Sequence, residues 1–196
     1  MLILASGSPR RAKILTDLGV EFKAVKSDAP EVSYPHDPER TVRENALSKG
    51  ASVGATRTPY PPSEASFAKQ SGYRGVAPQG ILSADTIVWF NNRIYGKPKD
   101  LDEAKEYLRE LSGNVHTVFT GVAYDGEVKV VKSDVKFRRL SDAMIDEYVA
   151  RVKPTDRAGA YDIDESGDLI VESYTGSYEN IMGLPMEPLK EWGIVK

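Results

Sequence analysis

The sequence contains no cysteine and two histidines, and these shortages exclude several kinds of chemistry. Without cysteine the chain can form no disulfide, no thiolate zinc site and no cysteine nucleophile. His36 and His116 alone cannot supply a three-histidine metal centre. A metal bound within this chain must therefore take oxygen ligands, which are the ligands that Mg²⁺ and Mn²⁺ prefer.

The chain also lacks a long apolar run and an excess of positive charge. No stretch approaches the ~20 apolar residues that cross a bilayer, and the apolar start at residues 1–5 is too short for a signal peptide. Among 196 residues, 26 basic and 29 acidic side chains give a net charge of −3, which provides no general basic field for a long nucleic acid. We therefore expect a soluble, cytoplasmic protein that binds neither membranes nor nucleic acid. A small anionic ligand in a locally basic cleft remains compatible with this charge.

The pattern of apolar residues predicts a mixed α/β fold. Two hairpins are expected, one at Asn91-Asn92 and a stronger one at Asp125-Gly126. Crossover connections through helices are expected elsewhere, so the sheet should contain both parallel and antiparallel strands. The expected strands are residues 1–5, 21–26, 81–90, 93–95, 115–124, 127–137 and 168–174, and the expected helices are residues 9–18, 38–54, 101–112, 142–151 and 186–192.

Residues 56–80 differ in composition from the rest of the chain. Four prolines lie here among serine, glycine and glutamine, a composition typical of a surface loop or a lid rather than of a core element. The sequence shows no internal repeat. We interpret residues 1–196 as one domain of two lobes, with residues 56–80 as a proline-rich insertion.

The turn from Ser6 to Arg11 is the first candidate for a binding site. A strand that passes through a Ser/Gly turn into a helix directs backbone N–H groups and the positive end of the helix dipole at one point. Arg10 and Arg11 add guanidinium groups suited to phosphate. An ordinary Ser-Pro helix start with solvated arginines is the alternative. The sequence has no Walker loop and no Gly-x-Gly-x-x-Gly pattern.

Asp85 is the second candidate because it interrupts an apolar strand, where a buried charge is costly unless it is paired, metal-bound or functional. Lys97 follows the next hairpin and could return to the same region, although a surface lysine is the simpler interpretation. Glu31 and Lys49 are not distinctive alone. His116 is more simply a structural residue than a catalytic base, and His36 is expected to be exposed.

Taken together, these residues resemble the Maf family of nucleoside triphosphate pyrophosphatases. The resemblance covers nearly the whole chain in the order of the family. Its blocks are Leu4-Ala5-Ser6-Gly7-Ser8-Pro9-Arg10-Arg11, Glu31, Lys49, Ala84-Asp85-Thr86-Ile87-Val88, Gly96-Lys97-Pro98, residues 111–116, Ala158-Gly159-Ala160-Tyr161 and residues 176–185.

The resemblance implies an enzyme that cleaves a nucleoside triphosphate between the α and β phosphates with a divalent cation, Mg²⁺ or Mn²⁺. It implies an elongated mixed β-sheet flanked by helices, two lobes with a nucleotide-binding cleft between them, and often a homodimer. By position, the implied roles are Asp85 as the catalytic carboxylate and metal ligand, Glu31 as a second metal ligand, Ser6, Arg11, Lys49 and Lys97 as phosphate-binding residues, and Arg10, Thr86 and Asp164 as determinants of base preference.

Arg10 with Thr86 resembles the subgroup that hydrolyses dTTP and UTP, but two residues depart from it. Asp164 stands where that subgroup usually has glutamine, and Asp162 where it usually has glycine. An ionised aspartate only accepts hydrogen bonds, so it suits the N1–H and amino group of guanine better than the O4 of uracil. A pyrophosphatase for 7-methyl-GTP or another modified purine nucleotide is therefore the alternative for the substrate.

Two further functions stay open at this point. One is a nucleotide-binding regulator of cell septation without significant turnover, which would not need Glu31 and Asp85 among cations. The other is an enzyme for deaminated purine triphosphates, like the inosine triphosphatases, against which the Ser-Pro-Arg-Arg start argues.

Overall fold

The fold is seen in a computed structural model that describes residues 1–55 and 80–196. Within these residues seven strands form one mixed sheet, in the order β2-β1-β3-β5-β6-β7 with β4 paired to β3. β1 is parallel to β2 and to β3, and the remaining pairs are antiparallel. The expected mixed α/β fold is therefore confirmed. The strands are β1 (Leu2–Leu4), β2 (Phe22–Ala24), β3 (Ile81–Phe90), β4 (Arg93–Tyr95), β5 (Val115–Tyr124), β6 (Glu127–Phe137) and β7 (Val171–Thr175).

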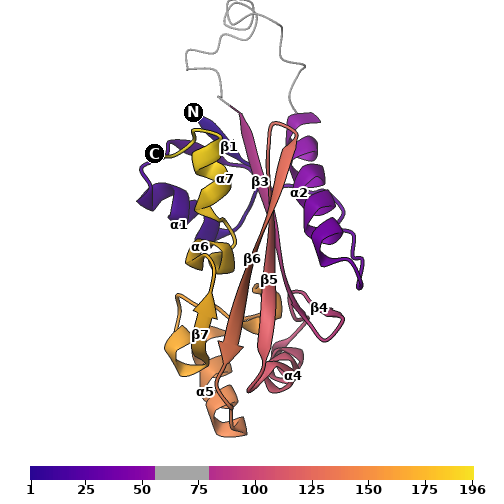
Figure 1. Ribbon diagram of the computed structural model, residues 1–196, viewed down its shortest axis with the longest axis vertical. Helices are drawn as coiled ribbons and strands as arrows, with labels where there is room; N and C mark the ends of the chain where they lie inside the picture. Colours follow the sequence, from indigo (N-terminus) through magenta and orange to yellow (C-terminus); the bar gives the residue numbers. More distant parts are fainter. Residues whose placement is uncertain (56–79) are drawn as a thin grey trace, which may run out of the picture.

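The helices flank the long strands β3, β5 and β6, which run along the long axis of the molecule (Figure 1). α2 lies to one side of these strands and α1, α6 and α7 to the other, while α4 and α5 lie toward the lower end. None of the described helices is long and apolar enough to span a membrane. The helices are α1 (Pro9–Asp17), α2 (Pro38–Ala55), α4 (Leu101–Leu111), α5 (Asp142–Val152), α6 (Tyr178–Met182) and α7 (Met186–Glu191), with short 3₁₀ turns η1 (Ala158–Ala160) and η2 (Gly167–Leu169).

The two largest clusters of buried apolar side chains lie at different positions along β3. Leu82 and Ala84 belong to the cluster that also includes Leu15 of α1, whereas Val88 belongs to the one that includes Leu108 of α4. Asp85 and Thr86 follow Ala84 directly, between these two clusters. The strand therefore presents polar side chains at the junction of two packed regions, where its own backbone is rigidly paired with β5.

The two predicted hairpin turns are confirmed. Both residues of each predicted hairpin turn have positive φ values, as a type I′ turn requires. The carboxylate of Asp100 accepts a hydrogen bond from the N–H of Glu103 at the start of α4 (2.8 Å), and Ser141 caps α5. Ser8 stands at the N-cap position of α1, but its side chain makes no capping bond.

The segment after α5 differs from the prediction. The expected strand at 168–174 begins only at Val171, because Ser166 adopts a left-handed conformation and residues 167–169 form the turn η2. α6 was not predicted as a helix, although Ser177 caps it and Gly183 ends it. The predicted insertion lies outside the described residues, apart from Gly80.

α2 lies unusually close to β5, at Gly121. A β-carbon at this position would be 2.4 Å from the carbonyl oxygen of Val42, a distance that two backbones could relieve only by moving apart. The absence of a side chain at Gly121 therefore lets α2 pack directly on the sheet. α2 carries Asn45 and Lys49, and their side chains reach Asp85 on the neighbouring strand β3.

Candidate active site

One cleft of about 750 Å³ contains most of the residues that the sequence analysis singled out. Its walls are the turn after β1 with the start of α1, the loop after β2, one face of α2, the middle of β3 and residues 181–183 at the end of α6. Residues 94–97 and 156–163 complete it from the other end of the sheet. Of the nine candidate residues, Asp164 is the one that does not line this cleft.

Asp85, Lys49 and Glu31 meet in the cleft. The Nζ atom of Lys49 lies 2.5 Å from Oδ1 of Asp85 and 2.7 Å from Oε1 of Glu31. Asp85 is buried, with 6% of the residue exposed, whereas the side chain of Glu31 is 59% exposed. One ammonium group thus holds a rigid carboxylate and a solvent-accessible one on either side of it.

Asn45 is a residue of this site that the sequence analysis missed. Its Nδ2 donates to Oδ2 of Asp85 (3.0 Å) and to the carbonyl oxygen of Val32 (3.0 Å), and its Oδ1 accepts from the N–H of Val32 (2.8 Å). A single buried amide therefore ties the backbone next to Glu31 to Asp85. Asn45 lies one turn before Lys49 on α2, and this i, i+4 spacing is the signal that could have identified it.

Arg11 is a partly buried cation of the cleft. Its guanidinium donates to Ser6 Oγ (3.2 Å), Thr86 Oγ1 (2.9 Å) and the carbonyl oxygen of Gly183 (2.7 Å), which are all uncharged acceptors. Burial lowers the pKa of Arg11 to about 10, so that the side chain remains charged at neutral pH. Its charge is therefore fixed in position and is not offset by a directly bonded carboxylate.

The hydroxyl of Thr86 supports Arg11 as part of a chain of hydrogen bonds. Thr86 Oγ1 accepts from Arg11 and lies 3.0 Å from Thr120 Oγ1, which in turn donates to the carbonyl oxygen of Asn180 (3.1 Å). Because the proton of Thr120 is directed to Asn180, the proton of Thr86 must be directed to Thr120. Thr86 therefore has no hydroxyl proton left to donate into the cleft.

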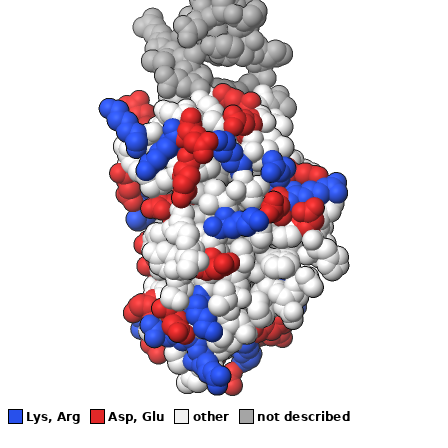
Figure 2. Space-filling view, in the orientation of Figure 1, with Lys and Arg blue, Asp and Glu red and all other residues white. Residues whose placement is uncertain are grey.

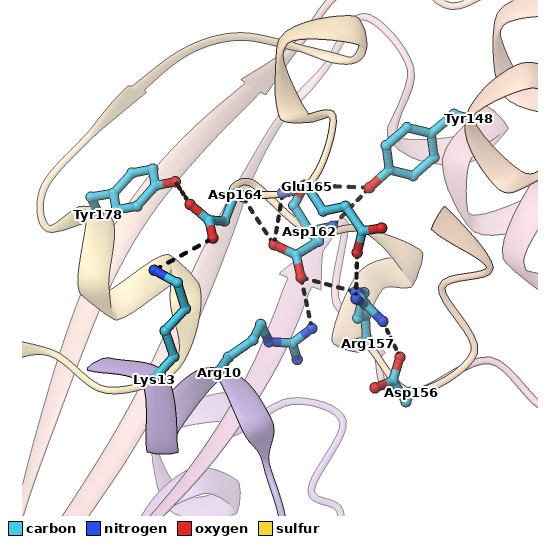
Figure 3. A network of polar contacts seen from close by, with 9 residues as sticks. All are labelled: Arg10, Lys13, Tyr148, Asp156, Arg157, Asp162, Asp164, Glu165 and Tyr178. Carbon is cyan, nitrogen blue, oxygen red and sulfur yellow. Dashed lines mark hydrogen bonds and ion pairs between the residues drawn. The ribbon is translucent and has the colours of Figure 1, made fainter. Parts of the chain in front are cut away.

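A second charged network lies at the end of the cleft formed by residues 156–163 (Figure 3). Asp162 lies between Arg10 (3.2 Å) and Arg157 (2.9 Å). Asp164 points away to the hydroxyl of Tyr178 (3.1 Å) and to Lys13 (4.0 Å). The structure thus brings Asp162 into the cleft wall and leaves Asp164 outside it.

Lys26 and Lys97 complete the set of cations that line the cleft. Both are exposed, and neither forms an ion pair with another of the described residues. Lys26 was also missed in the sequence, because an exposed lysine after a short strand carries no distinctive pattern. On the face shown in Figure 2, acidic and basic side chains are interspersed.

Glu31 and Asp85 have the donor chemistry of a magnesium or manganese site. Both carboxylates already converge on one cation, the ammonium group of Lys49, and both supply hard oxygen ligands. No cluster of three or more histidine, aspartate or glutamate side chains suited to a metal occurs in residues 1–55 and 80–196. A Mg²⁺ ion fits this pair because it commonly uses one or two carboxylates and takes its other ligands from phosphate and water.

His116 is buried in the core and does not itself line the cleft, in agreement with the structural role expected for it. Its Nε2 is 3.0 Å from the hydroxyl of Tyr161, and the ring packs edge-on against Phe137. Burial lowers the pKa of His116 from 6.5 to about 3, so the imidazole is neutral in the folded protein.

We expect this buried imidazole to make the protein sensitive to acid. The unfolded chain takes up a proton at His116 as the pH falls below 6.5, whereas the folded chain does so only near pH 3. The free energy of unfolding should therefore decrease between these two values, by up to about 1.4 kcal/mol per pH unit from this group. Urea unfolding of the wild type and of His116→Gln measures this, with the exposed His36→Gln as the control. Equal pH slopes in the wild type and His116→Gln would contradict the expectation.

Comparison with known proteins identifies the family of this chain. The chain matches the Maf family, described as Maf-like protein, over residues 1–192, and it belongs to this family. It is 38% identical over 198 residues to a protein of Thermosipho melanesiensis named dTTP/UTP pyrophosphatase, covering 99% of this chain and 96% of the relative. Proteins with the same name from Desulfitobacterium hafniense (40% identical, 99% of this chain, 86% of the relative) and Bacillus cereus (37%, 96% and 91%) are also similar.

Proposed function

We propose that this protein hydrolyses dTTP and UTP to the nucleoside monophosphate and pyrophosphate. The observation that carries the proposal is the convergence of Asp85 and Glu31 on Lys49 in a cleft that also holds Arg11, Lys26 and Lys97. A triphosphate carries about four negative charges, and such a site offers cations and metal-binding oxygens at one place. The names of the similar proteins support the same substrates.

This proposal assigns roles to Asp85, Arg11, Lys49 and Lys97. Asp85 accepts the proton of the attacking water, and its place on a paired strand keeps the carboxylate rigid. Arg11, held by Ser6 and the carbonyl oxygen of Gly183, stabilises the charge that develops on the phosphoryl oxygens. Lys49 and the exposed Lys97 bind phosphate.

The mechanism is a direct in-line attack of water on the α phosphorus. The cleft residues lack cysteine, and no serine or threonine among them is paired with a base as a nucleophile would require. The bond from the α phosphorus to the bridging oxygen breaks, and pyrophosphate leaves among the cations. Mg²⁺ or Mn²⁺ held by Glu31 and Asp85 would supply Lewis-acid stabilisation of the phosphates when bound.

The proposal also covers the location, domain organisation and oligomeric state of the enzyme. We infer that the enzyme acts in the cytoplasm as a single domain of two lobes and that it forms a homodimer. Residues 56–80 form an insertion in this interpretation. Gel filtration with light scattering measures the homodimer, and a monomer at micromolar concentration would contradict it.

A substrate panel tests the proposed function. Pyrophosphate release from dTTP, UTP, CTP, 7-methyl-GTP and ITP is measured with Mg²⁺ and with Mn²⁺. We expect dTTP and UTP to give the highest kcat/KM. A higher value for 7-methyl-GTP would favour the modified-purine alternative, and the highest value for ITP would favour an enzyme of deaminated purine nucleotides. Tight binding of dTTP without release of pyrophosphate would favour a regulatory protein.

A further inference from the structure

Asp162 is held from four sides at the end of the cleft (Figure 3). Its Oδ2 accepts from Arg10 (3.2 Å) and Arg157 (2.9 Å), and its Oδ1 accepts from the backbone N–H groups of Asp164 (2.9 Å) and Glu165 (3.4 Å). The side chain is 4% exposed. Burial would raise the pKa of Asp162, but Arg10 and the other donors outweigh it and hold the pKa below its usual value. Asp162 is therefore ionised, and its two carboxylate oxygens already accept four hydrogen bonds.

The two arginines on this carboxylate are held differently. Arg157 also contacts Asp156 and Glu165, so its guanidinium is fixed by carboxylates on several sides. Arg10 bonds Asp162 through Nη1 only, its side chain is 25% exposed, and it lines the cleft. Its remaining N–H groups have no partner among residues 1–55 and 80–196. Asp162 thus orients a guanidinium whose other donors stay available to a ligand.

Neither Thr86 nor Asp164 offers a free hydrogen-bond donor to a ligand beside Arg10. The hydroxyl proton of Thr86 is directed to Thr120, and the carboxylate of Asp164 lies outside the cleft on Tyr178. Arg10 adjoins Arg11, which is bonded to Thr86 beside Asp85. Through these contacts the cleft leads from the carboxylate pair, past Arg11, to Arg10 and Asp162. With the phosphates at the first end, the base of a nucleotide lies toward the second.

We propose that Asp162 is a positioning residue that holds Arg10 so that its free N–H groups bind an oxo group on the base of the substrate. A guanidinium only donates hydrogen bonds, so it matches a carbonyl oxygen and opposes an amino group. With the oxo group at C4 as the acceptor, the site selects uracil and thymine over cytosine, which carries an amino group at C4. This inference rests on the proposed function. It adds Asp162 as the residue that holds Arg10 in place for base recognition.

The test compares UTP with CTP. Uracil carries an oxo group at C4 and a proton on N3, whereas cytosine carries an amino group at C4 and no proton on N3. We expect the wild type to prefer UTP by at least about tenfold in kcat/KM. Asp162→Asn should lower the UTP:CTP ratio about tenfold, mainly through the KM for UTP, because the neutral amide holds Arg10 less firmly. Arg10→Ala should lower the ratio at least as far, and adding Asp162→Asn to it should change the ratio no further.

Glu165→Gln is the matched control, because Glu165 contacts Arg157 (2.8 Å) but makes no contact with Arg10 in the network. Its UTP:CTP ratio should stay within about twofold of the wild type. An unchanged ratio in Asp162→Asn would overturn the inference. If that variant does not fold, an unchanged ratio in Arg10→Ala overturns it instead. A wild type that cleaves UTP and CTP equally would also overturn it, whereas a wild type that cleaves no nucleotide would contradict the proposed function itself.

Discussion

Asp85→Asn should lower the rate of pyrophosphate release by about 10³-fold or more while leaving the fold intact. The amide has the shape of the carboxylate and can still accept a hydrogen bond from Lys49, so the packing around β3 should persist. It cannot take a proton from water, and it is a poor ligand for a divalent cation. Steady-state release of pyrophosphate from dTTP and UTP at saturating Mg²⁺ measures the loss, and circular dichroism with thermal unfolding verifies the fold.

Asp134→Asn is the control for this variant. Asp134 also lies on a strand of the sheet, but it is exposed on β6, contacts Thr117 (2.7 Å) and does not line the cleft. Its turnover should equal that of the wild type. Near-normal turnover in a folded Asp85→Asn protein would refute the role of Asp85.

Arg11→Met should produce the second largest loss, about 10²–10³-fold in kcat/KM. Methionine fills a similar buried volume but removes the one cleft guanidinium whose three hydrogen bonds all go to uncharged acceptors. Arg11→Lys should also lose activity, because an ammonium group cannot reproduce the planar fork that reaches Ser6, Thr86 and Gly183 together. Measured kcat and KM for dTTP separate weaker binding from slower chemistry.

The control for Arg11 lies on the same helix. Lys13 is exposed and pairs with Asp17 within α1 (3.0 Å), so Lys13→Met removes a positive charge close by without touching the cleft. Its kcat/KM should remain close to that of the wild type. If Arg11→Met behaves like Lys13→Met, Arg11 only supports the packing of the turn after β1.

The sequence predicted those parts of the structure that depend on local pattern. Strongly apolar runs and Asx-Gly or Asn-Asn turns predicted β3, β5 and β6 and their hairpins, and the isolated charge in β3 identified Asp85. A charge within an apolar strand is informative because its burial must be compensated somewhere in the fold.

Contacts between distant segments could not be predicted in this way. In the sequence, Asn45 is an ordinary polar residue of a predicted helix. Only the packing of α2 on β3 brings it to Asp85. The orientation of Asp162 and Asp164 depends on the turn at residues 162–165, in which the Asp162 carboxylate binds the following N–H groups. That turn directs Asp164 to Tyr178, whereas the resemblance to the family implies a role for Asp164 in base preference.

The central claim is that water attacks the α phosphorus of the nucleotide in this cleft. The position of bond cleavage tests this claim most directly. The protein is incubated with dTTP and Mg²⁺ in ¹⁸O-labelled water, and the products are identified by ³¹P NMR and mass spectrometry. Attack of water on the α phosphorus, aided by Asp85 and Arg11, predicts dTMP and pyrophosphate in equal amounts, with the label in dTMP alone. Label in pyrophosphate, or release of dTDP and inorganic phosphate, would contradict this account of the cleft.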